Sequence, residues 1–383
     1  MGYNRGMDWT ALRTEFPVTA RWAYLDHAAV AAPSGRAHRI LVEWADDTVA
    51  NGVVPEPVWL RRVEASRAAA ARLLDADPLD IAFVKNTSEG IDFVAEGFPW
   101  RAGDNVITAA EEYPSNLYPW LNLQSRGVEV RMVQSRGPRI AIDDIRAAMD
   151  QRTRLVSLSF VEFASGFRND LQAIGSLCRE RGIYFFVDAI QGLGVLPLSV
   201  RQTPVDFLSA DGHKWMLGPE GAGLFWLRRE LVDLLRPIAV GWHSVVGAWE
   251  FSTIDFRLKP HAGRWESGTL NVGGICALGA SLELLLEIGI EQISARVLEL
   301  TDHLCQRAAQ VGLEVFSSRQ GQDRSGIVSL IVPGANAREL ARRCRDAGMV
   351  VSARAGRLRV SPHFYNTPAE LDRLVNFLAG RIS

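Results

Sequence analysis

Short apolar runs alternate with helical segments between residues 81 and 227, and this alternation limits the possible fold more than any other feature of the chain. Seven runs of four to seven residues have the composition of buried strands, and helical patterns near 91–98, 142–150 and 170–181 separate several of them. Because parallel strands need crossover connections, the pattern predicts an α/β fold with a mainly parallel, seven-stranded sheet and helices on both faces. The runs are 81–84, 105–110, 128–133, 155–160, 183–189, 205–210 and 223–227.

The pattern changes after about residue 275, where long helical segments dominate. We predict a smaller α+β domain there, with a large domain at 21–275, a small domain at 276–383 and an N-terminal arm at 1–20 that joins the small domain. The evidence is a set of helical patterns near 275–288, 290–311, 336–348 and 368–381, with strand-like runs at 326–332 and 357–361.

Polar side chains stand at the carboxyl ends of the predicted strands. A turn at 86–90 follows the first strand, Asp188 ends a later strand with Gln191 just after it, and Lys214 follows the next strand. Ligands of open α/β sheets bind at these ends, so one pocket could gather all of them.

Lysine is scarce in this chain. Only Lys85, Lys214 and Lys259 are present, although lysine and arginine together number 42. A lysine kept between His213 and Trp215 suggests a chemical role, because a lysine amine can form a Schiff base and a guanidinium cannot. An ordinary surface lysine is the alternative interpretation.

Nucleotide-binding motifs do not account for this pattern. The glycine-rich segment at 192–197 lacks the third glycine of GxGxxG, and no GxxxxGK[ST] occurs. Pyridoxal phosphate fits better, since it needs a lysine, a carboxylate at its pyridine nitrogen, a phosphate-binding turn and a flat contact for its ring. Lys214 and Asp188 supply the first two. Thr87 and Ser88 supply the third at a helix N-terminus, unless they only cap the helix.

Composition narrows the classes of partner and location. A net charge of −2 argues against nucleic acid or an anionic membrane as the main partner. No secretory apolar region is visible near residue 1, and Glu283 and Glu287 interrupt the longest apolar stretch. The four cysteines are widely separated and lack metal-ligand spacing, which is typical of reduced thiols in a cytoplasmic protein without a metal site.

Seven separate motifs occur in order along nearly the whole chain: "AYLDHAA", "NTSEG", "EEYPSNLYPW", "FVDAIQG", "DGHKW", "RWESGTLN" and "RLRVSPHFYNT". Together they resemble the class V aminotransferase family of fold-type I pyridoxal phosphate enzymes, which includes cysteine desulfurases, selenocysteine lyases and isopenicillin N epimerase-like proteins. The resemblance implies the fold-type I transferase architecture, with residues 21–275 as the domain that binds pyridoxal 5'-phosphate.

The resemblance also implies a role for each matching residue. Lys214 would be the Schiff-base lysine and Asp188 the partner of the pyridine nitrogen, while Gln191 would hydrogen-bond the ring hydroxyl oxygen. The phosphate cup would be formed by Thr87, Ser88 and His213.

Two further motifs imply contacts beyond the cofactor. Gly268 and Thr269 correspond to a segment that in the family reaches the phosphate of the neighbouring subunit, so the resemblance implies a homodimer with shared active sites. Arg359 matches the arginine that binds the substrate α-carboxylate, a task suited to a planar bidentate donor. Without its motif, Arg359 would be interpreted as part of a surface salt bridge.

Three positions depart from the family pattern. Tyr113 stands where desulfurases place a stacking histidine, so it can stack on the cofactor but is a poorer proton carrier near neutrality. Phe163 replaces an asparagine near the ring hydroxyl. Asp211 replaces a serine, and its charge would repel a phosphate dianion unless the carboxylate is turned away or bound to a donor.

The segment at 350–361 contains no cysteine, and Cys344 lies upstream in a helical pattern. We therefore expect that classical persulfide-forming cysteine desulfuration is disfavoured. The leading prediction is a class V aminotransferase that acts on a small α-amino acid. A cysteine-independent C–S lyase, an epimerase and a catalytically inactive binding protein are the alternatives.

Overall fold

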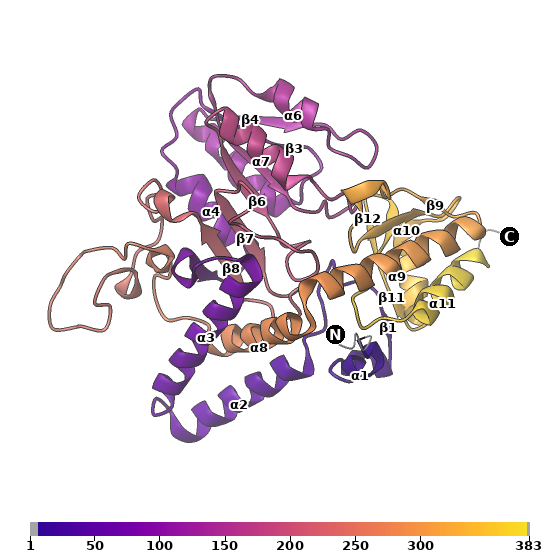
Figure 1. Ribbon diagram of the computed structural model, residues 1–383, viewed down its shortest axis with the longest axis horizontal. Coiled ribbons are helices and arrows are strands. Elements are labelled where there is room, and N and C mark those ends of the chain that lie inside the picture. The colour runs from indigo at the N-terminus through magenta and orange to yellow at the C-terminus, as the bar shows by residue number, and fades with distance from the viewer. Residues whose placement is uncertain (1–6, 381–383) are drawn as a thin grey trace, which may run out of the picture.

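A computed structural model describes residues 7–380 of the chain and has a seven-stranded sheet at its centre (Figure 1). The strand order is β2-β8-β7-β6-β5-β3-β4. β8 is antiparallel to its neighbours β2 and β7, and the other pairs are parallel. The predicted mainly parallel α/β sheet is thus confirmed. Its strands are β2 (Ile81–Val84), β3 (Asn105–Ala109), β4 (Glu129–Val133), β5 (Thr153–Ser159), β6 (Tyr184–Asp188), β7 (Phe207–Asp211) and β8 (Gly223–Leu227).

Helices cover both faces of this sheet. Successive side chains of a strand point to opposite faces, so Phe185 and Val187 lie in one core and Phe186 lies in the other. Burial on both faces explains why the central strands are continuous apolar runs in the sequence. One face carries α3 (Glu56–Leu74), α6 (Ile142–Ala148), α7 (Leu171–Glu180) and α8 (Val272–Ile288), with α2 (Gly35–Asn51) packed on α8, and the other carries α4 (Thr87–Gly97) and α5 (Tyr118–Asn122).

A smaller antiparallel sheet forms the α+β region predicted toward the C-terminus. Its strand order is β12-β13-β10-β9, and it shares a separate core with three helices (Figure 1). The strands are β9 (Glu314–Val315), β10 (Val328–Ile331), β12 (Ser352–Arg354) and β13 (Arg357–Val360). The helices are α9 (Ile290–Gln310), α10 (Ala337–Asp346) and α11 (Pro368–Ala379).

The N-terminal segment is tied to this smaller region. β1 (Ala23–Tyr24) pairs in parallel with β11 (Met349–Val350), and Arg13 at the end of α1 (Trp9–Arg13) forms an ion pair with Glu370 at 2.8 Å. These contacts bring segments more than 300 residues apart in the chain into contact beside the large sheet.

Helix α9 joins the two cores, because Val297 packs in the large core and Leu300 in the small one. The domain limits at residues 20 and 275 stay a prediction, and residues 1–6 of the predicted arm lie outside the described part of the chain. No single helix within residues 7–380 is long and apolar enough to cross a membrane. α8 and α9 meet the length and composition criteria only as a pair bent by 82°.

Candidate active site

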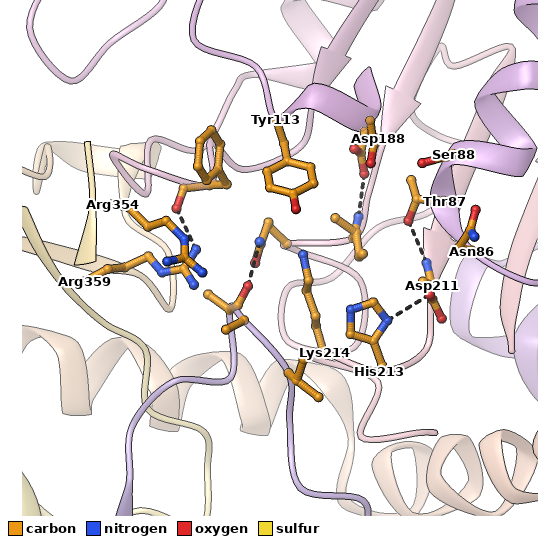
Figure 2. A pocket seen from close by; sticks show the side chains of 17 residues that line it. Asn86, Thr87, Ser88, Tyr113, Asp188, Asp211, His213, Lys214, Arg354 and Arg359 are labelled. Carbon is orange, nitrogen blue, oxygen red and sulfur yellow. Dashed lines mark hydrogen bonds and ion pairs between the residues drawn. The ribbon is translucent and has the colours of Figure 1, made fainter. Parts of the chain in front are cut away.

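A pocket of about 440 Å³ opens at the carboxyl ends of the central strands (Figure 2). This is the edge at which open α/β sheets bind ligands. Eight of the ten residues predicted for the site line the pocket, and Gly268 and Thr269 do not. The eight are Thr87, Ser88, Tyr113, Asp188, Gln191, His213, Lys214 and Arg359.

Lys214 enters the pocket from a tight turn that directly follows β7. The Leu217 N–H donates to the Lys214 carbonyl at 3.1 Å, and Leu217 has a left-handed φ of +57°. Such strained backbone is concentrated at functional sites. Lys214 is only 8% exposed, and burial lowers its pKa to about 8 although the negative charge of Asp188 opposes the change. A lysine with a lowered pKa is better suited to act as a nucleophile or base near neutrality.

Asp188 is the last residue of β6 and is almost fully buried. The Ile190 N–H donates to its Oδ1 at 3.0 Å, which fixes the carboxylate toward the pocket. Burial raises the Asp188 pKa to about 6, while the Ile190 bond and the charge of Lys214 lower it. A buried carboxylate of this kind favours a cationic partner.

Two more buried acids lie near Asp188. Glu112 accepts the Ser159 N–H at 2.6 Å, and Glu162 accepts Nδ2 of Asn169 at 2.8 Å. Burial raises the pKa of Glu112 to about 8 and that of Glu162 well above its usual range. Burial therefore favours the neutral form of both carboxyl groups.

Helix α4 begins at the opposite side of the pocket from the arginines (Figure 2). Asn86 caps this helix with its side-chain oxygen, so the interpretation that Thr87 and Ser88 only cap it is wrong. Gly90 permits a close approach to β7, because a Cβ at position 90 would lie 2.3 Å from the Ser209 Oγ. Thr87 and Ser88 thus stand in the first turn of an 11-residue helix, where free N–H groups and the helix dipole favour an anion.

The side chain of Asp211 lies within ion-pair distance of His213. Its Oδ2 lies 2.8 Å from Nδ1 of His213, and its N–H donates to the Thr87 Oγ1 at 3.0 Å (Figure 2). The two side chains therefore face each other without the geometry of a hydrogen bond, and Oδ1 of Asp211 has no hydrogen-bond partner within the described part of the chain.

Two aromatic rings line the pocket, and one of them, Tyr113, stands between the start of α4 and the arginines (Figure 2). Tyr113 and Phe163 pack edge to face with ring centres 5.2 Å apart. The Lys214 Nζ lies 5.5 Å from the centre of the Tyr113 ring. Tyr113 is 44% exposed, so a flat ligand can reach its face.

Gln191 has its side-chain amide fixed at the pocket wall. Nε2 donates to the Ala28 carbonyl at 3.0 Å, and Oε1 accepts the Trp215 indole N–H at 3.0 Å. One N–H of Nε2 is left for a ligand.

Arg359 is buried, so the interpretation as a surface salt bridge is wrong. It is 1% exposed, and burial lowers its pKa to about 10 while Asp26 raises it. The guanidinium donates to the Ser352 Oγ at 3.2 Å, the Phe163 carbonyl at 3.0 Å and the Asp26 Oδ1 at 3.2 Å.

Gly268 and Thr269 line a separate cavity of about 260 Å³. Lys85 and Glu89 also line this cavity, whereas Lys214 does not. The predicted contact of Gly268 and Thr269 is with the phosphate of a neighbouring subunit, and it stays a prediction.

Sequence reasoning missed three residues of the site. Asn86 precedes Thr87 and is a preferred capping residue, so its role could have been found from the motif. Asp26 was visible only as a polar residue in a small-residue loop. Arg354 lines the pocket beside Arg359 (Figure 2), and its position depends on the pairing of two short strands.

Comparison with known proteins identifies the family. The family model described as Aminotransferase class-V matches residues 24–374. The chain belongs to the class V aminotransferase family. A "Probable cysteine desulfurase" of Methanothermobacter thermautotrophicus is 30% identical over 386 residues, which cover 95% of each chain.

Two solved structures share the fold. The cysteine desulfurase CsdA of Escherichia coli is 25% identical, with a TM-score of 0.88 over 99% of each chain. A variant of C-DES that carries glycine covalently linked to its pyridoxal phosphate cofactor is 22% identical, with a TM-score of 0.90 over 96% of this chain and 98% of that one.

Relatives named as cysteine desulfurases contradict our expectation that classical cysteine desulfuration is disfavoured. That expectation depended on the lack of a cysteine at 350–361. In the structure, this segment contains the short hairpin β12–β13. The relative named as a probable cysteine desulfurase matches over 95% of both chains, so the similarity extends far beyond that single segment. The absence of a cysteine at 350–361 therefore does not decide the reaction.

The cofactor of this class V family is pyridoxal phosphate, and the donor set of the pocket fits it. A buried amine, a buried carboxylate, an aromatic face and the N-terminus of α4 all face one cavity. These are the groups that the cofactor's aldehyde, pyridine nitrogen, ring and phosphate require.

Proposed function

We propose that this chain is a pyridoxal phosphate enzyme that cleaves a C–S bond of a small α-amino acid. The convergence of Lys214, Asp188 and Arg359 on one pocket carries the proposal, because it joins an amine, a carboxylate and a carboxylate-binding cation. Relatives named as cysteine desulfurases support the C–S bond as the one that breaks.

Bound pyridoxal phosphate would link covalently to an amine and take up the electron pair released when a bond to the substrate Cα breaks. Asp188 would keep a proton on the pyridine nitrogen, since a neighbouring anion favours the charged form. Gln191 would donate its remaining N–H to the ring hydroxyl oxygen.

Lys214 would remove and return the proton of the substrate Cα. Its pKa of about 8 allows both protonation states near neutrality, as general acid–base catalysis requires. The Tyr113 ring, whose centre is 5.5 Å from the Lys214 Nζ, would lie against the face of the cofactor.

The phosphate would bind at the start of α4, through Thr87 and Ser88 with their backbone N–H groups, and through His213. Because the Thr87 Oγ1 already accepts the Asp211 N–H, its hydroxyl hydrogen is free to be donated to an anion. Asp211, 2.8 Å from His213, would orient the imidazole.

The substrate α-carboxylate would bind to Arg359. A guanidinium has five N–H donors, and three of those on Arg359 are used by Ser352, Phe163 and Asp26. The other two match one bidentate carboxylate.

Product analysis with the holoenzyme tests the proposal. We would incubate it with cysteine and S-substituted cysteines and measure alanine, pyruvate, sulfide and keto acids separately. We expect sulfur release, and a loss of at least about 100-fold in Lys214→Ala and Lys214→Arg, because neither variant keeps the amine that moves the proton. Lys259→Arg is the matched control and should keep full activity, because Lys259 lines neither the pocket of Lys214 nor the cavity of Gly268 and Thr269. Wild-type sulfur release by Lys214→Ala would contradict the assignment.

Transamination is the second candidate, favoured by the description of the matching family model. It begins with the same proton transfer by Lys214. Keto acid formation without sulfur release would replace the first candidate by the second, and D-amino acid formation would indicate an epimerase. Failure to take up pyridoxal phosphate in a direct titration would favour a binding protein.

We extend the proposal to a homodimer with shared active sites. Gly268 and Thr269 lie away from the pocket of their own chain, which is compatible with contact to the phosphate of a partner. The nearby segment 238–256 exposes large apolar side chains, among them Ile254 at 95% and Phe251 at 70%. Exposed apolar clusters of this kind mark interaction sites.

The cytoplasm is the compartment we assign as part of this proposal. All four cysteines are free thiols, and three of them are buried. Unpaired thiols are typical of proteins in a reducing compartment.

A further inference from the structure

Arg354 is an uncommitted cation at the wall of the active-site pocket. It ends β12, is partly exposed, and lies beside Arg359 on the side away from Asp188 and Ser88 (Figure 2). Within the described part of the chain, the Arg354 side chain forms a single hydrogen bond, in which its guanidinium donates to the carbonyl of the preceding residue, Ala353, at 2.8 Å. Among the residues that the structure describes, no carboxylate forms an ion pair with it.

The hairpin explains how Arg354 reaches this position. Ser352 pairs with Arg359 and Arg354 pairs with Arg357 across the two strands. Residues two apart on a strand, and directly paired residues on antiparallel strands, share a face, so Arg354 projects to the same side as Arg359. Arg357 shares this face but stacks on Phe316, with its guanidinium carbon 3.7 Å from the ring centre, and does not line the pocket.

The α-carboxylate of a substrate does not require Arg354. Arg359 keeps two N–H donors after its three hydrogen bonds, and these suffice for one carboxylate. Arg354 has four unused N–H donors on its guanidinium, which are available to a ligand in the pocket.

The position of Arg354 also has an electrostatic cost. Burial lowers the pKa of Lys214 to about 8 and that of Arg359 to about 10, and the positive charge of Arg354 adds to both effects. Lys214 faces the carboxylate of Asp188, and Arg359 is paired with Asp26, so Arg354 is the cation of the three whose charge is left for an anionic ligand.

We infer that Arg354 binds an anionic group at the end of the substrate side chain, so that the enzyme selects α-amino acids with a side-chain carboxylate or sulfinate. This inference names the substrate class of the proposed function and rests on it for the placement of the α-carboxylate on Arg359. Arg354 is a specificity residue in this assignment and takes no part in bond breaking.

Binding of matched ligand pairs to the holoenzyme tests the inference. The pairs are aspartate with asparagine, and S-carboxymethylcysteine with S-carbamoylmethylcysteine, which differ in charge at nearly constant shape. Titrations followed by cofactor absorbance give the ratio of dissociation constants. We expect the acidic member to bind at least about 10-fold more tightly, as charge-assisted hydrogen bonds do. Arg354→Gln should bring the ratio close to 1, Arg354→Lys should restore part of it, and Arg357→Gln should leave it unchanged.

Three results would overturn the inference. One is an equal loss of affinity for the acidic and neutral members in Arg354→Gln, which would assign Arg354 to the α-carboxylate. Another is an unchanged preference in that variant, whatever its oligomeric state, and the third is equally tight binding of the acidic and neutral members by the wild-type holoenzyme. The titration measures binding without C–S cleavage. Acid preference without sulfur release would therefore refute the proposed function alone, and sulfur release without acid preference would refute this inference alone.

Discussion

Lys214 and Asp188 control each other's charge in the pocket. The Lys214 pKa of about 8 leaves about 10% of the amine unprotonated at pH 7, compared with about 0.03% for a lysine of ordinary pKa. Burial is the main cause, and the charge of Asp188 works against it. Removal of the Asp188 charge should therefore lower the Lys214 pKa further.

This dependence can be measured by amine labelling of the cofactor-free protein. Only three lysines are present, so mass spectrometry can follow each one across pH. Lys214 labelling should rise through a midpoint near pH 8, and in Asp188→Asn that midpoint should fall by about one pH unit, because an opposite charge no longer favours the ammonium form. Lys85, with a side chain 70% exposed, is the internal reference. A midpoint that rises in Asp188→Asn would refute the coupling.

The sequence predicted the residues at strand ends better than those in the small region. Lys214 and Asp188 directly follow or end buried apolar runs, and the topology of a parallel sheet brings such ends together. Arg354 reaches the pocket only because β12 and β13 pair in one register, and a register between three-residue and four-residue strands has no local sequence signal. The approach of Asp211 to His213 likewise depends on side-chain geometry, which the spacing of the two residues in the sequence does not determine.

The hairpin β12–β13 contains a turn whose sequence does not match its conformation. Ala355 and Gly356 connect the paired residues Arg354 and Arg357, with φ of +45° and +76°. A two-residue loop with two positive φ angles favours Asn-Gly, and a non-glycine residue other than Asn or Asp is strained there. This mismatch explains why the sequence indicated one strand at 357–361 and no hairpin.

Ala355→Asn should therefore stabilise the protein by about 0.5–1 kcal/mol, because it relieves part of the backbone strain. Urea unfolding of the cofactor-free protein measures the change. Ala353→Asn is the matched control, since Ala353 lies within the strand β12 and should gain nothing. A loss of stability in Ala355→Asn would show that the turn does not have the assigned geometry.

Longer elements were predicted to within a few residues. The helix expected near 290–311 is α9 (Ile290–Gln310), and the strand expected at 81–84 is β2 (Ile81–Val84). Their periodicity follows from burial on one or two faces. β1 and β11 have two residues each and no period, so their pairing across the chain could not be read from the sequence.

The distribution of apolar surface over the molecule favours assembly. Large exposed side chains gather in segment 238–256, which extends from the body of the molecule as a loop beside the large sheet (Figure 1). They include Trp249 at 52%, Phe251 at 70%, Ile254 at 95% and Phe256 at 71% exposed. Gly268 and Thr269 follow this segment in the chain and lie outside the pocket of their own subunit.

If two copies bury this segment together, its disruption should affect both assembly and the cofactor. We expect the double variant Phe251→Asp, Ile254→Asp to sediment as a monomer and to bind pyridoxal phosphate at least about 10-fold more weakly. Charges are disfavoured at interface cores, and a monomer would lose any phosphate contact from the partner. Met132→Asp is the control, because Met132 is 44% exposed on the distant edge strand β4. A variant that stays dimeric would exclude segment 238–256 from the interface. A monomer with unchanged affinity for pyridoxal phosphate would refute the shared site, because the pocket of one chain would then hold the cofactor without Gly268 and Thr269 of the other.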